Sequence, residues 1–274
     1  MTSISWVEVG DRVFVRRYEF LDQTIGAIVG DDGAVVVDTR TTYAQADELR
    51  AHLRALTPKP LLAVVNTHHH YDHTFGNARF VPVPIWGHDR CAAALREGGE
   101  EMRQRVAARM PELVAELAEV VITPPDRTFD ELATLDLGGR QVQLCYLGRG
   151  HTDNDVVVLV PDADVVFAGD LLENRAPPSF GDGFPVAWAE TVADRLLPLV
   201  RDTVVPGHGD PAGRDFAERQ AGELGLVARL VHSSLAGVIG LDEALATSPY
   251  PAEVTRVALE RGRLELGGHQ ATDL

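Results

Sequence analysis

Four of the ten histidines lie within six residues, and their spacing is suited to binding metal ions. Residues 68–73 contain the pattern His-x-His-x-Asp-His. Imidazole is the commonest protein ligand of transition metals, and a carboxylate adds a ligand of opposite charge. In an extended chain His68 and His70 share one face, while Asp72 and His73 follow where the chain must turn. The segment therefore predicts two pairs of ligands for two neighbouring metal ions.

A histidine cluster has a simpler explanation, because most histidines are surface residues or hydrogen-bonded core residues. Here the cluster is internal and follows the apolar run 61–65, which is typical of a buried strand. Burying several imidazoles and a carboxylate without a cation to organise them is costly. The metal interpretation is therefore favoured.

Three further residues with ligand-type side chains follow other apolar runs. His151 comes after the strand-like stretch 141–146, Asp170 after 165–169, and His208 after 203–207. Open sheets in α/β proteins place binding sites at the carboxyl ends of their strands. These three residues are the candidates that would complete a two-metal site, and Gly169 would let the backbone approach it closely.

In this order, the motifs resemble those of the metallo-β-lactamase superfamily of hydrolases. The matching positions are Asp38, His68, His70, Asp72, His73, His151, Asp170 and His208. The resemblance covers about residues 10–215. It implies an α/β protein with a four-layer αβ/βα sandwich, in which two mixed β-sheets are covered by outer helices.

The same resemblance divides the ligands between two divalent ions: His68, His70 and His151 for the first, Asp72, His73 and His208 for the second, and Asp170 for both. Asp38 would orient the histidine-rich loop, a role that metal sites generally need. The ions are expected to be Zn²⁺, although the mixed histidine and aspartate set also suits iron or manganese.

The implied chemistry is hydrolysis, because metal ions lower the pKa of bound water from 15.7 to about 7. A metal-bridging hydroxide would attack a small acyl substrate (a thioester, lactone or ester, with weak β-lactam hydrolysis as a further activity), and Asp72 and Asp170 would be catalytic. True β-lactamases commonly carry cysteine or serine at the position of Asp170, and many carry lysine at that of Glu173. A bridging aspartate is instead similar to glyoxalase II-type thioesterases and lactonases.

Two other function classes stay open at this point. Persulfide dioxygenases share the histidine motifs but use a single iron, and they would make the protein an oxidoreductase. A binding protein without activity is disfavoured because no ligand is missing. The diiron flavoproteins of the superfamily usually carry glutamate at the position of His70 and need a flavin domain.

Composition limits the partners. The net charge of −16 argues against nucleic acid, which needs a basic surface. No apolar run approaches the roughly 18 residues of a membrane span. Residues 1–6 lack a basic region followed by an apolar core, so a cytoplasmic location is expected. The expected partner is a small-molecule substrate. A homo-oligomer is compatible with the sequence. Cys91 and Cys145 are interpreted as small buried hydrophobic residues.

We predict a single domain over 1–274, with a core at about 10–215 and a helical C-terminal extension at about 215–274. The predicted elements are a hairpin turn at 31–33, a helix over 43–56, helices over 89–120 broken at Gly98-Gly99 and Pro111, and helices over 186–200, 215–245 and 252–261. Residues 171–188 are expected to form a loop. Its aromatic residues Phe180, Phe184 and Trp188 fit either a substrate wall or the core, and Arg175 could bind a substrate carboxylate.

Overall fold

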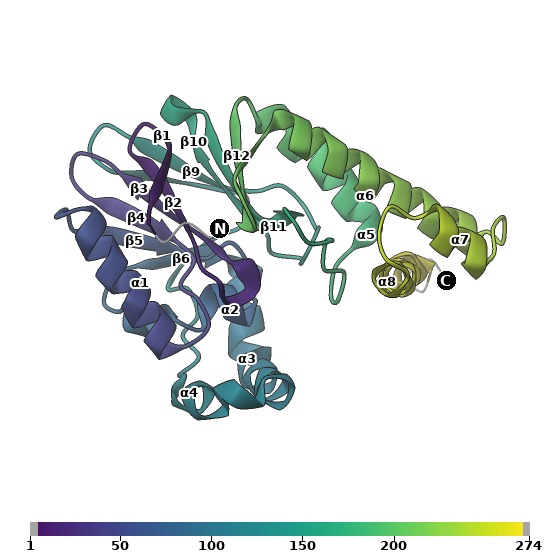
Figure 1. The fold of residues 1–274 in the computed structure, drawn as a ribbon, viewed down its shortest axis with the longest axis horizontal. Helices are drawn as coiled ribbons and strands as arrows, with labels where there is room; N and C mark the ends of the chain where they lie inside the picture. Colours follow the sequence, from purple (N-terminus) through teal and green to yellow (C-terminus); the bar gives the residue numbers. More distant parts are fainter. Residues whose placement is uncertain (1–4, 271–274) are drawn as a thin grey trace.

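Two mixed β-sheets pack face to face with helices on their outer sides (Figure 1). The computed structural model describes residues 5–270. The first sheet has the order β1 (Val7–Gly10), β2 (Val13–Arg17), β3 (Thr24–Val29), β4 (Ala34–Val37), β5 (Leu61–Val65), β6 (Ile85–His88) and β7 (Arg127–Phe129). The second has the order β13 (Ala212–Gly213), β12 (Thr203–His208), β11 (Val165–Glu173), β10 (Val156–Val160), β9 (Gln141–Tyr146) and β8 (Leu132–Asp136).

The alternation of side chains along the strands builds the layers. In β10, Val156, Val158 and Val160 face the first sheet, whereas Val157 and Leu159 face the helices on the other side. Because successive side chains of a strand point to opposite faces, an uninterrupted apolar run is buried on both. Strands β4, β5 and β10 are accordingly apolar throughout.

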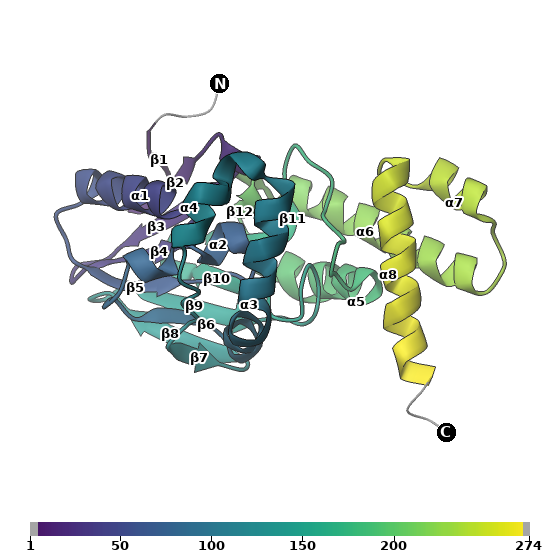
Figure 2. The same ribbon diagram turned by 90° about the horizontal axis from the view of Figure 1, so that it is seen from below.

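Helices cover the two outer faces. On the first sheet lies α1 (Tyr43–Leu56), with Thr42 as its N-cap. Near the edge of that sheet lie α3 (Asp89–Arg109) and α4 (Val114–Glu119), while α5 (Pro185–Glu190) and α6 (Arg214–Leu235) pack on the second sheet. Helix α8 (Ala252–Gln270) packs on α5 and α6. The short α7 (Leu241–Thr247) connects α6 and α8 (Figure 2). This arrangement confirms the predicted four-layer αβ/βα sandwich.

Several element boundaries differ from the sequence prediction. Helix α3 runs unbroken through Gly98-Gly99. Glycine at position 99 serves packing and does not end the helix, because a side chain there would meet Ile122 Cγ2 at 2.6 Å. The predicted helix 215–245 is two helices, α6 and α7, separated at residues 236–240. Strand β11 continues through Asp170 to Glu173, where a loop was expected.

The assignment of residues 1–274 to one domain stays a prediction, and residues 1–4 and 271–274 lie outside the described part of the chain. Within residues 5–270, no helix has both the length and the apolar character that crossing a bilayer requires. A cytoplasmic location and the choice of partners stay predictions.

Candidate metal centre

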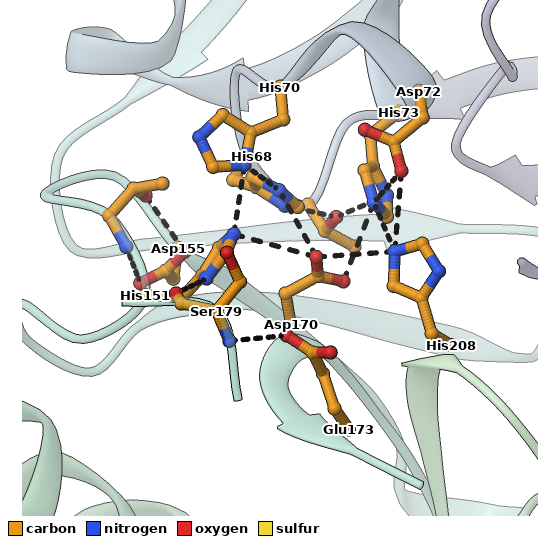
Figure 3. A network of polar contacts seen from close by, with 12 residues as sticks. His68, His70, Asp72, His73, His151, Asp155, Asp170, Glu173, Ser179 and His208 are labelled. Carbon is orange, nitrogen blue, oxygen red and sulfur yellow. Dashed lines mark hydrogen bonds and ion pairs between the residues drawn. The ribbon is translucent and has the colours of Figure 1, made fainter. Parts of the chain in front are cut away.

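All seven predicted ligands come together where strands of both sheets end (Figure 3). The loop after β5 carries the histidine-rich segment, and the helical turn α2 (Tyr71–Thr74) turns Asp72 and His73 inward. The loop between β9 and β10 carries His151. Strands β11 and β12, which are parallel neighbours, carry Asp170 and His208.

The first set of ligands is a triangle of imidazole nitrogens. Nδ1 of His70 lies 3.0 Å from Nε2 of His68 and 2.8 Å from Nε2 of His151. A tetrahedral zinc ion with Zn–N bonds of 2.0–2.1 Å separates its ligand nitrogens by about 3.3 Å. The triangle is therefore close to the geometry that one such ion requires.

The second set lies beside the first and contains a carboxylate. Nε2 of His73 is 3.4 Å from Nε2 of His208, and both nitrogens lie near Asp72 Oδ2, at 3.2 and 3.3 Å. These three side chains, like the first set with Asp170, offer ligand atoms within 4.8 Å of one another.

Asp170 lies between the two sets. Its Oδ2 is 3.5 Å from Nε2 of His151 and 3.3 Å from Nε2 of His208, so one carboxylate reaches both (Figure 3). Its Oδ1 is buried, has no hydrogen-bond partner among the described residues and lies 3.4 Å from Nε2 of His73. A buried carboxylate oxygen without a donor is costly, and a cation would satisfy it. The donors present therefore fit a pair of divalent ions.

Every histidine of the two sets has an acceptor at its outer nitrogen. The partners and distances are Thr67 Oγ1 for His68 (3.1 Å), Asp182 for His70 (3.0 Å), Ser179 O for His151 (3.1 Å), Asp38 Oδ2 for His73 (2.8 Å) and Leu21 O for His208 (2.7 Å). An outer N–H that donates leaves the inner nitrogen with its lone pair directed into the centre. The five imidazoles are thus oriented as metal ligands.

Asp38 holds the histidine-rich loop through hydrogen bonds, in line with the orienting role expected from the sequence. Its carboxylate accepts hydrogen bonds from Thr67 N (2.8 Å), Thr67 Oγ1 (2.8 Å) and His73 Nδ1 (2.8 Å). Because Thr67 Oγ1 donates to Asp38, its lone pairs are free to accept from His68. One buried carboxylate therefore fixes a histidine of each set.

The electrostatics differ among the five histidines. Burial opposes the charge of His70, but the Asp182 carboxylate raises its pKa above the ordinary value. Burial lowers the pKa of His151 to about 4 and holds the pKa of His68 well below its ordinary value, so both are neutral and ready to bind metal. Burial opposes the charge of His73 and His208 too, but the carboxylates of Asp72 and Asp170 raise both pKa values well above the ordinary range.

Other residues that the sequence singled out have structural roles. Phe180 and Trp188 are buried in the core beneath the second sheet, so the core alternative holds for them, whereas Phe184 is half-buried. Arg175 forms an ion pair with Asp210. Glu173 is buried and receives a hydrogen bond from Ser179 N, and burial with the nearby Asp170 charge raises its pKa to about 8.

Sequence reasoning missed Asp182, whose carboxylate lies 3.0 and 3.1 Å from His70 Nε2. The available signal was its place in the loop after the Asp170 strand. Asp182 also forms a group with His69 and His70 that has metal-binding residue types. A cation there would have to take the nitrogen through which His70 donates its proton, so we interpret the contact as a hydrogen bond.

The fold and site define a class, the metal-binding αβ/βα sandwich hydrolases. Residues 18–208 match the family described as the metallo-beta-lactamase superfamily, and the chain belongs to that superfamily. Many of its members are metal-dependent hydrolases, and this chain carries histidine and aspartate groups that could bind metal.

Known relatives differ in what they act on. The chain is 32% identical to "Metallo-beta-lactamase type 2" of Bacteroides fragilis over 50% of this chain and 55% of that protein. It is 28% identical to "Acyl-coenzyme A thioesterase MBLAC2" of Gallus gallus, over 81% of this chain and 87% of that protein. It is 26% identical to "Linear primary-alkylsulfatase" of a Pseudomonas strain, over 70% of this chain and 42% of that protein. The chain thus spans about half the length of several curated relatives.

Solved structures show the same fold. A metallo-beta-lactamase from Pontibacter korlensis superposes with a TM-score of 0.61 and 21% identity, over 80% of this chain and 98% of that chain. The sec-alkylsulfatase Pisa1 from Pseudomonas sp. superposes with a TM-score of 0.73 and 17% identity, over 96% of this chain and 50% of that chain.

Proposed function

We propose that the protein is a dinuclear metal-dependent hydrolase of small acyl substrates, with an acyl thioester as the favoured class. The observation that carries the proposal is the position of Asp170 between two sets of inward-facing ligands. A residue so placed would hold two ions as neighbours. Two bound divalent ions would supply a nucleophile from water near neutral pH and charge to stabilise an anionic leaving group.

Residues of the chain would orient the metal ligands and accept a proton from water. The outer acceptors fix the direction of each imidazole, which keeps the site organised before substrate binds. Asp72 is buried beside His73 and His208, and its carboxylate is placed to accept a proton from a water molecule held in the second set. No serine or cysteine nucleophile is needed.

The favoured substrate class is supported by the relatives. The acyl-coenzyme A thioesterase is similar over most of both chains, and a hydroxyacylglutathione hydrolase of Synechococcus is 30% identical over 51% of this chain. This chain has aspartate at position 170, where true β-lactamases commonly carry cysteine or serine. These features support an acyl thioester over a β-lactam.

Sulfate-ester hydrolysis is a second candidate. A linear primary-alkylsulfatase is similar over 70% of this chain, and the fold of Pisa1 matches 96% of it, which includes the C-terminal helices. The bond that breaks would then be a sulfate ester rather than an acyl bond, with the same ligands.

The test is metal analysis of protein purified without added metal, together with rates on matched substrates. We expect about two zinc ions per chain and faster turnover of acyl thioesters than of lactones, β-lactams or alkyl sulfates. One iron per chain with oxygen consumption on a persulfide would instead identify an oxidoreductase. A metal-loaded protein that turns over none of these compounds would contradict the proposal.

A further inference from the structure

The loop over residues 174–184 orients two histidines of the first set. The Asp182 carboxylate accepts a hydrogen bond from Nε2 of His70, and the carbonyl of Ser179 accepts one from Nδ1 of His151. The loop also joins the His151 segment through Phe184 N, which donates to Gly150 O at 2.8 Å. The direction of two of the three imidazoles therefore depends on where this loop lies.

The loop in turn is held by the last helix. Arg261 of α8 donates from Nη2 to Asp182 O at 2.9 Å and from Nε to Gly183 O at 3.1 Å. Its guanidinium also lies 5.9 Å from the centre of the Phe184 ring. A guanidinium that binds two adjacent carbonyls restrains both position and orientation of the main chain, because its donors have a fixed planar geometry.

A second contact from α8 fixes the end of the loop. Glu265 accepts hydrogen bonds from Val186 N (2.9 Å) and Ala187 N (2.9 Å), at the start of α5. These N–H groups have no partner within the helix, and a carboxylate is favoured at that end of a helix. Figure 2 shows α8 lying across α5 and α6. Arg261 and Glu265 are four residues apart, so they lie about one turn apart on the same face of α8.

We propose that α8 is part of the metal centre's support, and that Arg261 is a positioning residue for the first ion. The inference rests on the proposed metal site. It goes beyond the family match, which ends at residue 208, whereas Arg261 lies in the helical extension. Through Asp182, this helix would set the geometry of His70, and the contact of Phe184 N with Gly150 O would carry the same restraint to the segment of His151.

The effect should be confined to one of the two ions. The second set takes its outer acceptors from Asp38 and from the carbonyl of Leu21, which belong to the first sheet and its loops. Neither acceptor is held by α8. A loosened loop would therefore weaken the first ion and leave the second ion unchanged.

The experiment compares Arg261→Gln with Arg263→Gln. Arg263 lies on the same helix and is exposed, so its variant controls for loss of one positive charge. Stepwise affinities for Zn²⁺ are measured by competition with a chromophoric chelator, and the ligand-field spectrum of the Co²⁺ protein reports on geometry. We expect Arg261→Gln to weaken one of the two ions by 10-fold or more, with the other ion unchanged.

Equal affinities and spectra in the two variants would overturn the inference. If wild-type protein bound fewer than two ions, the proposed function would fail instead, and the two failures are thereby distinguished. Thermal unfolding of the metal-free variants shows whether Arg261→Gln is folded.

A second variant tests the inference even if Arg261→Gln does not fold. Asp182 has a side chain that is 47% exposed, so Asp182→Ala should fold normally. It should also weaken only the first ion, and adding Arg261→Gln should then have a smaller effect than it has alone, because both act on His70. Additive losses, or a loss at both ions, would contradict the positioning role.

Discussion

The backbone of Gly207 lies directly against the carboxylate of Asp170. A methyl group added at Gly207 would stand 1.8 Å from Asp170 Oδ1. The two residues are on parallel neighbouring strands, β12 and β11, so neither can move without shifting the second sheet. We expect Gly207→Ala to displace Asp170 and lower metal content below two ions per chain, measured by elemental analysis, with a rate loss of 10-fold or more.

The matched control is Gly222→Ala. Gly222 is exposed on α6, and a methyl group there would meet nothing within 4 Å. Alanine should stabilise the helix by about 0.5–1 kcal/mol, and metal content should stay the same. Equal metal content in both alanine variants would show that the Gly207 contact is unimportant.

The position of Asp170 between the two sets predicts a joint loss of both ions. Asp170→Ala should reduce metal content and activity together, with activity falling by 10-fold or more, because the ligand that reaches both sets is gone. Asp194→Ala, at an exposed position, is the control. Full activity in Asp170→Ala would show that no bridge is needed.

The metal-free protein should lose stability as pH rises above neutrality. The folded-state pKa values of His73 and His208 are raised by Asp72 and Asp170, and that of Glu173 is raised to about 8 by burial and by Asp170. Groups with a raised folded pKa stabilise the fold below the unfolded value and lose that contribution as pH rises through the raised value. His68 and His151 have lowered pKa values, so they change stability only below about pH 6.5.

Urea unfolding of chelator-treated protein between about pH 6.5 and 9 tests this expectation. We expect each of these groups to lower the free energy of unfolding by up to about 1.4 kcal/mol per pH unit between its unfolded and folded pKa values. In metal-loaded protein the ions replace the histidine protons, so the fall should be smaller. Parallel curves for the two forms would contradict the assignment of these histidines as ligands.

Trp188 should support the site from the core. It is 0% exposed, its Nε1 donates to Leu171 O at 3.1 Å, and its ring stands 5.5 Å from that of His151. Trp188→Phe should lower the free energy of unfolding by about 2–4 kcal/mol, because it leaves a cavity and an unpaired carbonyl. KM should be unchanged, since the ring is fully buried in the core. A raised KM with normal stability would favour the substrate-wall alternative.

Residue type and position explain why so much of the site could be predicted from the sequence. Ligand chemistry favours histidine and aspartate side chains, and the candidates follow strand-like stretches, as at His151 and His208. The order of these motifs carried the resemblance to the metallo-β-lactamase superfamily, and that resemblance implied the sandwich and the full set of ligands at one edge of it. The helix over 43–56 was equally predictable, because its apolar spacing and capping residue act locally.

Features that depend on distant contacts could not be predicted. The continuity of α3 through Gly99 depends on Ile122, which packs where a side chain would stand. The role of Asp182 depends on α8 placing its loop over His70, and nothing near residue 182 in the sequence indicates that helix. Main-chain acceptors, such as the carbonyl of Ser179, leave no mark on residue type at all.

The five outer acceptors differ in how they tolerate evolutionary change. Leu21 and Ser179 contribute carbonyl oxygens, which every amino acid possesses, so these positions can diverge among relatives as long as the backbone path is kept. Asp38, Thr67 and Asp182 act through their side chains, and their replacement removes the acceptor itself. Residue conservation would therefore identify only the side-chain acceptors that direct the imidazoles. The carbonyl acceptors depend on conservation of the backbone path.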